Sequence, residues 1–316
     1  MSKKSITSVG IEHDTLGIRA AKVSIVAGGE DSITELNALE EVRGVFENDK
    51  ELIDGIKSIK DTIGHHFGDR LATCVTGKQI YAAQTRFRIL PDEELRSALR
   101  FEMRKSLPFD VSGSVLEYQI IEAPEKKADK ADMLVTVVGS SIMQKHLQIF
   151  EKAGLKPDIV DIIPTAAANS FWSFRRQGIE PGIASVILHL SPSVCTLVFD
   201  GDNVTFFTRS IPFAAHEIFG TKPTEQSDRD AKFRLDTLID EVVRSLSFYE
   251  KTYRISKFAA LHPMGEYVCL PEALNALKNG IGLPISMKND YKKFDYSNTI
   301  TPGKFDIALA LAMRGE

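Results

Sequence analysis

The sequence predicts an α/β protein of two lobes, with an α+β unit inserted in the first lobe. Near the N-terminus, three strand-like segments are followed by an amphipathic helix, and the same order recurs after residue 183. Residues 86–154 differ, because there a strand is followed by a helix, two strands and a second helix. No residue-level repeat connects the two halves, so the expected duplication is one of architecture alone.

The first lobe begins with strands and one helix. Apolar and β-branched residues mark strands at 9–12, 18–26, 33–39 and 71–75, and the pair Gly28-Gly29 marks a turn. The helix lies before the last of these strands. Its apolar residues recur at steps of four, three and four, which places them on one helical face: Leu52, Ile56, Ile59 and Ile63.

The inserted unit is expected to begin with a strand at 81–90. Pro91 and the three acidic residues after it are typical of a helix start, where carboxylates lie near the positive end of the helix dipole. The apolar stripe of this helix ends at Pro108 and consists of Leu95, Leu99, Met103 and Leu107. Strands at 115–121 and 133–139 flank a charged run, 122–132, which predicts a solvated loop. A helix at 142–150 ends near Gly154.

A further helix at 165–177 leads into the second lobe. Strands are expected there at 184–190, 195–200 and 204–211, with a turn at 201–203. A long helix follows, and its apolar stripe is formed by Leu235, Leu238, Ile239, Val242, Leu246 and Tyr249. The order of strands and helix therefore matches that of the first lobe.

The composition excludes several classes of function. The chain has 316 residues, 43% of them hydrophobic and 26% charged, with a net charge of −4. Such a chain is globular and gives no reason to expect binding to nucleic acid or to anionic membranes. No window approaches the roughly 18–20 apolar residues of a membrane span, and no signal peptide is visible, so we expect a cytoplasmic protein. Cys74, Cys195 and Cys269 are isolated, which predicts neither a zinc site nor a catalytic cysteine.

Seven segments resemble the PilM family of type IV pilus assembly proteins. In chain order they are RFRILPDEEL at 86–95, FE at 101–102 with LPFD at 107–110, EY at 117–118, AGLKP at 153–157, TRSIP at 208–212, RSLSFY at 244–249 and ALALAMRG at 308–315. Each segment is short, but the ordered set covers nearly the whole chain.

The resemblance implies an actin-like fold related to the division protein FtsA. It divides the chain into lobe one (1–85, 155–180 and 304–316), an inserted subdomain (86–154) and lobe two (181–303). It also implies a cytoplasmic scaffold for a type IV pilus, or for a related competence or secretion machine. Such a scaffold binds the N-terminal cytoplasmic tail of the inner-membrane protein PilN and reaches the membrane only through that partner. Coupling to the assembly motor ATPase and self-association into a ring or filament would fit this role.

The nucleotide site of actin-like ATPases lies between the lobes, where two hairpins present backbone N–H groups to the phosphates. The family's first hairpin is roughly D-I-G-S-x-x-[IV]-K, and this chain has EHDTLGIR at 12–19. Glu12 replaces the aspartate, Asp14 replaces the glycine and Arg19 replaces the lysine, so that Asp14 adds negative charge where phosphates would lie. Glu12, Thr15 and Arg19 are the candidate contacts with nucleotide. Alternatively, Glu12 is a polar strand end, and Arg19 pairs with Asp14 or Glu12.

The second hairpin departs further from the family pattern. In place of V-D-I-G-A-x-x-T the chain has ILHLSPSV at 187–194, so Leu188 replaces the aspartate and Leu190 the glycine. The lost carboxylate removes a water-mediated magnesium contact, and Ser191 is the one weak candidate left there. The adenosine loop, LHPMGE at 261–266, keeps a single glycine. We therefore predict a degenerate cleft without ATP hydrolysis and without an assigned cofactor, and binding of ATP and magnesium is the alternative.

Other functions remain as alternatives. A nucleotide-binding actin-like ATPase would keep ATP and magnesium despite these changes. A GspL-like type II secretion component shares the fold but carries a membrane helix, which is not expected here. A small-molecule kinase would need a catalytic aspartate that the second hairpin does not offer. His13 and His189 would face each other across the cleft, but without a third ligand they predict no metal site.

For the partner tail, the resemblance implies an extended peptide between lobe one and the inserted subdomain. The candidate contacts are Arg86, Arg88, Arg100, Arg104 and Phe109. The alternative for the arginines is an ordinary solvated face, and Phe109 is equally well explained as a core residue after a helix stop.

Overall fold

In this computed structural model, the described residues are 5–26, 33–107, 109–121, 129–174, 179–211, 215, 228–255, 257–287 and 303–314. The strands are β1 (Ser5–His13), β2 (Gly17–Val26), β3 (Ile33–Arg43), β4 (Arg70–Val75), β5 (Ile80–Arg88), β6 (Val115–Ile120), β7 (Lys130–Val138), β8 (Ile159–Ile162), β9 (Ala184–Leu190), β10 (Cys195–Asp200), β11 (Phe207–Ile211) and β12 (Phe258–Met264). The helices are α1 (Asp49–Thr62), α2 (Asp92–Ser106), α3 (Ser140–Lys152), α4 (Ile163–Phe174), α6 (Asp228–Tyr253), α7 (Pro271–Ile281) and α8 (Asp306–Ala312), with a short 3-10 helix η1 (Glu266–Cys269).

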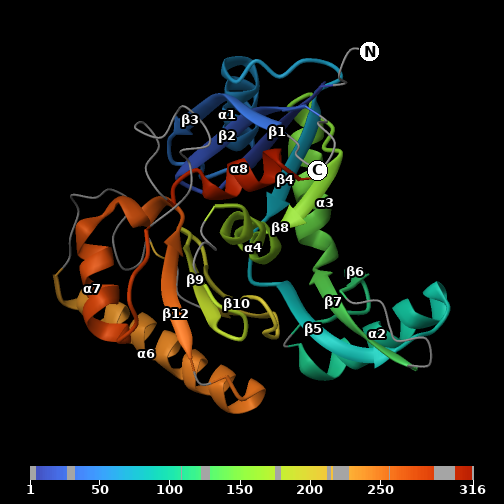
Figure 1. Cartoon of the computed structure of the whole chain (residues 1–316). Coiled ribbons are helices and arrows are strands. Elements are labelled where there is room, and N and C mark those ends of the chain that lie inside the picture. The colour runs from blue at the N-terminus through green and yellow to red at the C-terminus, as the bar shows by residue number, and fades with distance from the viewer. Residues whose placement is uncertain are drawn as a thin grey trace.

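Two β-sheets organise the molecule (Figure 1). The first has the strand order β3-β2-β1-β4-β8, and the second has the order β12-β9-β10-β11-β5-β7-β6. In the first sheet, β1, β2 and β3 form an antiparallel meander, and β4 pairs with β1 in parallel. In the second, β9, β10 and β11 form a similar meander, and β12 pairs with β9 in parallel. This recurrence agrees with the duplication of architecture that the sequence predicts.

The sheets and helices form layers. Helices α1 and α3 pack against one face of the first sheet, and α8 packs against its other face. Helices α6 and α7 cover the outer face of β9 and β10, while α4 covers their inner face. Because α4 and α8 also pack against each other, they form the layer between the two sheets. We call the first sheet with α1, α3 and α8 the first lobe, and β9–β12 with α6 and α7 the second lobe.

Helix α8 lies unusually close to the first sheet. A Cβ atom on Gly10 of β1 would lie 2.1 Å from the carbonyl oxygen of Ala308 and 2.4 Å from the amide nitrogen of Ala312. Only glycine therefore fits at this position of β1. All residues of α8 are buried, so this short helix is part of the core.

Strands β5, β6 and β7 together with α2 form an arm that projects from the second sheet (Figure 1). β5 joins β11 on one side and β7 on the other, and β6 is the outer strand. Helix α2 packs on one face of the arm through Leu95, Leu99 and Met103. Helix α3 follows the arm in sequence but packs on the first lobe through Ile149 and Phe150. The division at residues 86 and 154 stays a prediction.

Most expected elements are present, with bounds that differ by a few residues. The segment 261–266, expected as a loop, is strand as far as Met264, and β8, α7 and α8 were not expected as elements. Residues 122–128 of the predicted charged loop and 175–177 of the predicted helix lie outside the described residues. In the described part of the chain, no helix is long and apolar enough to cross a membrane.

Candidate functional site

The two predicted hairpins lie where the lobes meet. Glu12 and Arg19 are directly opposite each other in the register of β1 and β2, so their side chains leave the sheet on the same side and make contact. Thr15 is exposed in the turn between these strands. Ser191 is 1% exposed in the other turn, where its Oγ lies 3.3 Å from the Oγ of Ser193. The fold thus joins Glu12 and Arg19 and leaves Thr15 and Ser191 in the two turns.

Arg19 is the centre of this site and is completely buried. Its Nε and Nη2 donate to the two carboxylate oxygens of Glu12 at 3.3 Å each, and Nη2 also donates to Oδ2 of Asp14. Its Nη1 donates to Oε2 of Glu266 at 3.1 Å. One guanidinium therefore binds three carboxylates, which we call the Arg19 cluster (Glu12, Asp14, Arg19 and Glu266).

Asp14 has a second set of contacts within its own turn. Its Oδ1 accepts hydrogen bonds from the backbone N–H groups of Leu16 at 2.7 Å and Gly17 at 2.9 Å. The backbone N–H of Asp14 in turn donates to the carbonyl of Gly17 at 2.9 Å. Two backbone donors of the first hairpin are thus bound to a carboxylate of the same hairpin.

The second lobe reaches the Arg19 cluster through Glu266. This residue begins η1 directly after Gly265, whose φ of 100° favours glycine and whose Cβ would lie 2.6 Å from the carbonyl oxygen of Leu190. Lys304 lies 3.8 Å from Glu266 and pairs at 2.8 Å with Glu41 of β3. Ion pairs therefore connect β2 and β3 of the first lobe with η1 of the second.

The charges of the cluster fix its ionisation. Burial by itself raises the pKa of Glu12, but the charge of Arg19 and the contact with His189 outweigh burial and lower the pKa from 4.5 to about 2. Burial also opposes the charge of Arg19, whose pKa is nevertheless raised by Glu12 and Asp14. Glu12 and Arg19 are therefore both ionised at neutral pH.

The histidines pair differently from what the sequence suggests. His13 stacks on His146 of α3 with ring centroids 5.3 Å apart, and His13 Nε2 lies 3.3 Å from His146 Nδ1. His189 instead lies 3.5 Å from Glu12. Burial lowers the pKa of His13, and burial together with His13 lowers the pKa of His146 to about 3. The pair is thus neutral at physiological pH, and no three potential metal ligands gather anywhere among the described residues.

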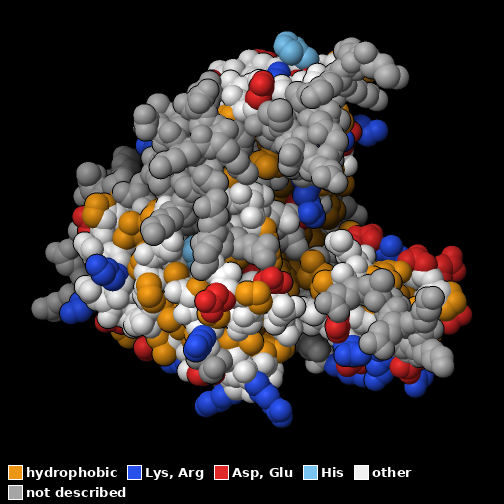
Figure 2. Space-filling model, viewed as in Figure 1, with side chains coloured by type: hydrophobic (Ala, Val, Ile, Leu, Met, Phe, Trp, Pro, Cys, Tyr) orange, Lys and Arg blue, Asp and Glu red, His pale blue; other side chains and the backbone are white. Residues whose placement is uncertain are grey.

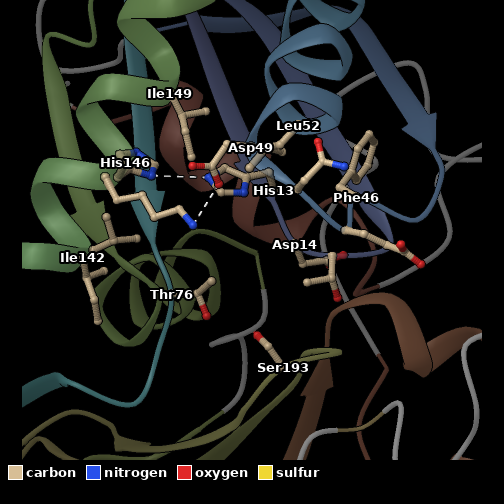
Figure 3. A pocket seen from close by; sticks show the side chains of 15 residues that line it. His13, Asp14, Phe46, Asp49, Leu52, Thr76, Ile142, His146, Ile149 and Ser193 are labelled. Atoms are coloured by element: carbon tan, nitrogen blue, oxygen red, sulfur yellow. Dashed lines mark hydrogen bonds and ion pairs between the residues drawn. The ribbon is translucent and has the colours of Figure 1, made fainter.

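A pocket of about 350 Å³ opens beside the first hairpin (Figure 3). Its lining includes Asp14 and Thr15 from the first hairpin and Ser193 from the second. The remaining lining comes from the ends of β1 and β4, from α1 and α3, and from the segments before α1 and after β4: His13, Phe46, Glu47, Asn48, Asp49, Leu52, Val75, Thr76, Ile142, Lys145, His146 and Ile149. Its one lysine, Lys145, is 2.8 Å from Asp49. Carboxylates therefore outnumber cationic side chains in this lining, which is unfavourable for a polyphosphate.

A separate groove of about 290 Å³ lies between the arm and the first lobe. The arm contributes residues of β6 and β7. The first lobe contributes β8, Met143 of α3 and Arg314, and Thr165 at the start of α4 completes the lining. Six apolar side chains line it: Val115, Leu134, Val138, Met143, Val160 and Ile162. Arg314 pairs with Asp161 at 3.0 Å at this site. Side chains alternate along a strand, and Met133, Val135 and Val137 pack toward α2, so the groove lies on the face of the arm opposite α2.

The predicted partner contacts divide between the two faces of the arm. Arg86 and Arg88 are exposed and lie opposite Asp132 and Lys130 in the β5–β7 register, which puts them on the groove face toward the tip of the arm. The other three belong to the α2 face. Arg100 donates to the carbonyls of Val111 at 3.0 Å and Ser114 at 2.7 Å, Arg104 is exposed on α2, and Phe109 is half-buried against the α2 core.

Sequence reasoning missed several residues of these sites. Glu266, Lys304 and His146 meet the first hairpin only through long-range packing, and no local pattern marks them. The groove was likewise expected between lobe one and the inserted subdomain, but none of its apolar lining residues was named. Side-chain alternation along β7 could have indicated them. Residues 133, 135 and 137 pack against α2, so residues 134, 136 and 138 must lie on the opposite face of the sheet, where the groove is.

Comparisons with known proteins agree with this architecture. A family model described as "Type IV pilus assembly protein PilM" matches residues 10–219. The structure is similar to that described as "PilM-PilN type IV pilus biogenesis complex", with a TM-score of 0.78 and 18% identity over 98% of both chains. It is also similar to the ethanolamine utilization protein EutJ from Carboxydothermus hydrogenoformans, with a TM-score of 0.52 and 12% identity over 98% of this chain and 90% of that one. No curated protein matches the sequence. The predicted two-lobed, actin-like α/β fold is thereby confirmed.

Proposed function

Because the chain belongs to the family of the type IV pilus assembly protein PilM, we propose that it is a scaffold that binds the cytoplasmic tail of a PilN-like inner-membrane protein. The tail would bind as an extended peptide in the groove between the arm and the first lobe. This groove is the observation that carries the proposal.

Both walls of the groove suit an extended peptide. β6 is the outer strand of the second sheet and β8 is the outer strand of the first, so each side offers the backbone of an edge strand. The apolar side chains between them offer room for alternate side chains of the peptide. Figure 2 shows the indentation between the arm and the first lobe at the right of the view. The expected tail therefore has apolar anchor residues and pairs through its main chain.

We infer in addition that the interlobe cleft is degenerate and that the scaffold works without ATP hydrolysis. Arg19, the cationic residue at the family's lysine position, is bound by three carboxylates, and Asp14 binds the backbone donors of the hairpin. ATP and magnesium binding would require this network to open. The rival function, a nucleotide-binding ATPase, predicts a saturable thermal shift with Mg-ATP.

The experiment is a calorimetric titration with a synthetic peptide of the partner's N-terminal residues, repeated separately with Mg-ATP. Leu134→Glu places a charge in the apolar groove and is expected to weaken peptide binding by at least about tenfold. Arg104→Glu, on the opposite face of the arm, is the matched control and is expected to change affinity by less than about twofold. Melting temperatures of both variants confirm that they are folded. If Arg104→Glu abolished binding and Leu134→Glu did not, the tail would bind the α2 face and the groove assignment would be wrong.

The same role places the protein in the cytoplasm and holds it at the inner membrane through its partner. Coupling to the motor ATPase and self-association are further predictions of this role. Co-purification with the motor tests the first, and sedimentation with and without the peptide tests the second.

A further inference from the structure

We propose that Asp14 is a built-in anion that fills an oxyanion-binding turn in the first hairpin, and that this turn binds a free oxyanion such as phosphate once the Asp14 carboxylate is removed. The proposal rests on the proposed function in one respect, namely that the wild-type cleft works without nucleotide.

The donors around Asp14 are those that recognise an oxyanion. Two successive backbone N–H groups, of Leu16 and Gly17, converge on Oδ1 at 2.7 and 2.9 Å. Arg19 donates to the other oxygen, Oδ2. Successive backbone donors in a turn form an anion-binding concavity, and a guanidinium adds charge-assisted hydrogen bonds to the same group. Both oxygens of one carboxylate are thus held in the manner of a bound phosphate or sulfate.

The contacts exceed those of a polar turn residue at the surface. Asp14 is only 7% exposed, and its guanidinium partner is completely buried. Through Arg19 the carboxylate is joined to Glu12 on the neighbouring strand and to Glu266 of the second lobe. A turn that needed only a local acceptor would not require a buried arginine on the second oxygen. The carboxylate therefore belongs to a charge network that reaches both lobes.

The site is also connected to a space that a free anion can enter. Asp14 lines the pocket of about 350 Å³ shown in Figure 3, and that pocket is far larger than a phosphate. The three donors do not line the pocket themselves, so removal of the Asp14 carboxylate would open the way from the pocket to two N–H groups and one guanidinium. It would also lower the number of carboxylates on Arg19 from three to two. An oxyanion entering the pocket would then restore the lost hydrogen bonds.

The backbone allows the test. Asp14 is not among the residues with positive φ, so alanine or glycine can adopt its conformation. In chloride buffer, Asp14→Ala and Asp14→Gly are expected to melt below the wild type, because buried donors lose their acceptor. Inorganic phosphate at the same ionic strength is expected to raise their melting temperatures saturably, with half-saturation in the millimolar range, and to leave the wild type unchanged.

Asp14→Asn is the matched control. Its amide oxygen still accepts from Leu16 and Gly17 and fills the same space, so phosphate is expected to have no specific effect on its melting temperature. Phosphorus NMR line broadening of inorganic phosphate provides a second readout that does not depend on stability. A further titration with Mg-ATP shows whether the site that opens accepts only a small oxyanion or a nucleotide as well, and either answer supports an opened anion site.

Three results would overturn the proposal. The first is a phosphate response of Asp14→Ala and Asp14→Gly no larger than that of Asp14→Asn. The second is an equal response of the wild type. The third is that Asp14→Ala and Asp14→Gly are unfolded in chloride and remain unfolded in phosphate. If phosphate occupied the site, it would restore the lost hydrogen bonds and with them the fold. Peptide binding by the wild type is measured in parallel, so that a scaffold without a tail site is distinguished from a hairpin without an anion site.

Discussion

Among the residues that the structure describes, no cation pairs with the buried carboxylate of Asp200, and its replacement by asparagine is expected to stabilise the protein above neutral pH. It ends β10 and is 7% exposed. Its Oδ2 accepts a hydrogen bond from Trp172 Nε1 at 2.7 Å, and its Oδ1 accepts one from the backbone N–H of Gly201 at 2.8 Å. Neither donor is charged, so burial dominates and raises the pKa of Asp200 from 3.8 to about 6.

The sign of the effect follows from linkage. A carboxyl group with a raised pKa in the folded state contributes its full stabilisation only below its unfolded pKa of 3.8, and this stabilisation is lost as the pH rises from there through about 6. A rise of about two pKa units corresponds to about 3 kcal/mol, at about 1.4 kcal/mol per unit. The side chain of asparagine has one oxygen for the two donors, Trp172 and Gly201, so one hydrogen bond is lost. That loss reduces the expected gain in stability by about 1 kcal/mol. At pH 5 the unfolded-state carboxyl is already ionised, so about half of this penalty is present, and Asp200→Asn should gain about 2 kcal/mol at pH 8 but only about 0.5 kcal/mol at pH 5.

Urea unfolding at pH 5 and pH 8 measures this difference. Trp172 is the single tryptophan of the sequence, so its fluorescence reports directly on the group that donates to Asp200. In the wild type the emission should change with a midpoint near pH 6, and in Asp200→Asn this transition should be absent. The exposed Asp240→Asn on α6 serves as the control. If Asp200→Asn changed stability by the same amount at both pH values, the argument from burial of a charge would be wrong.

Two further predictions concern the core and the Arg19 cluster. Gly10→Ala is expected to lower the free energy of unfolding by about 3 kcal/mol or more, because a Cβ 2.1 Å from the carbonyl oxygen of Ala308 must displace α8. Urea unfolding measures this loss. An unchanged urea midpoint would mean that α8 does not pack against β1 as described. Arg19→Met is expected to cost about 3–5 kcal/mol at pH 7, because Glu12 and Asp14 are left buried without their cation. The pKa of Glu12 would then rise, so this variant should regain stability when the pH is lowered from 7 to 5, and a loss of stability over that range would contradict the ion-pair assignment.

The sequence predicted those parts of the fold that depend on local periodicity. The stripe Leu52, Ile56, Ile59 predicts α1, and β9 and β10 have the bounds expected from their apolar runs. β12 was missed because it contains Pro263, which suits an outer strand such as β12 but is typical of loops in general. α8 was missed because it is apolar on all sides and lacks the amphipathic period.

The candidate sites divide in the same way. The pairing of Glu12 with Arg19 follows from strand register and was among the predicted alternatives. The contribution of Glu266 depends on how η1 of the second lobe packs against the first, and no spacing in the sequence specifies that. Arg100 is a second case in which the sequence does not specify the contact. Its place on a predicted helix does not reveal that its side chain donates to the loop carbonyls of Val111 and Ser114 instead of contacting a partner.

Helix α8 connects the Arg19 cluster physically with the groove. Lys304, two residues before α8, lies near Glu266, and Arg314, two residues after it, pairs with Asp161 in the groove. The helix between them is buried throughout, and a closely packed element of this length responds as a unit. A tail that displaced Arg314 would therefore act on the element that holds Lys304, and any coupling would be reciprocal in free energy. The affinity of Arg19→Met for the peptide tests this coupling. A changed affinity would support it, and an unchanged affinity in a folded variant would show that the groove and the Arg19 cluster act independently.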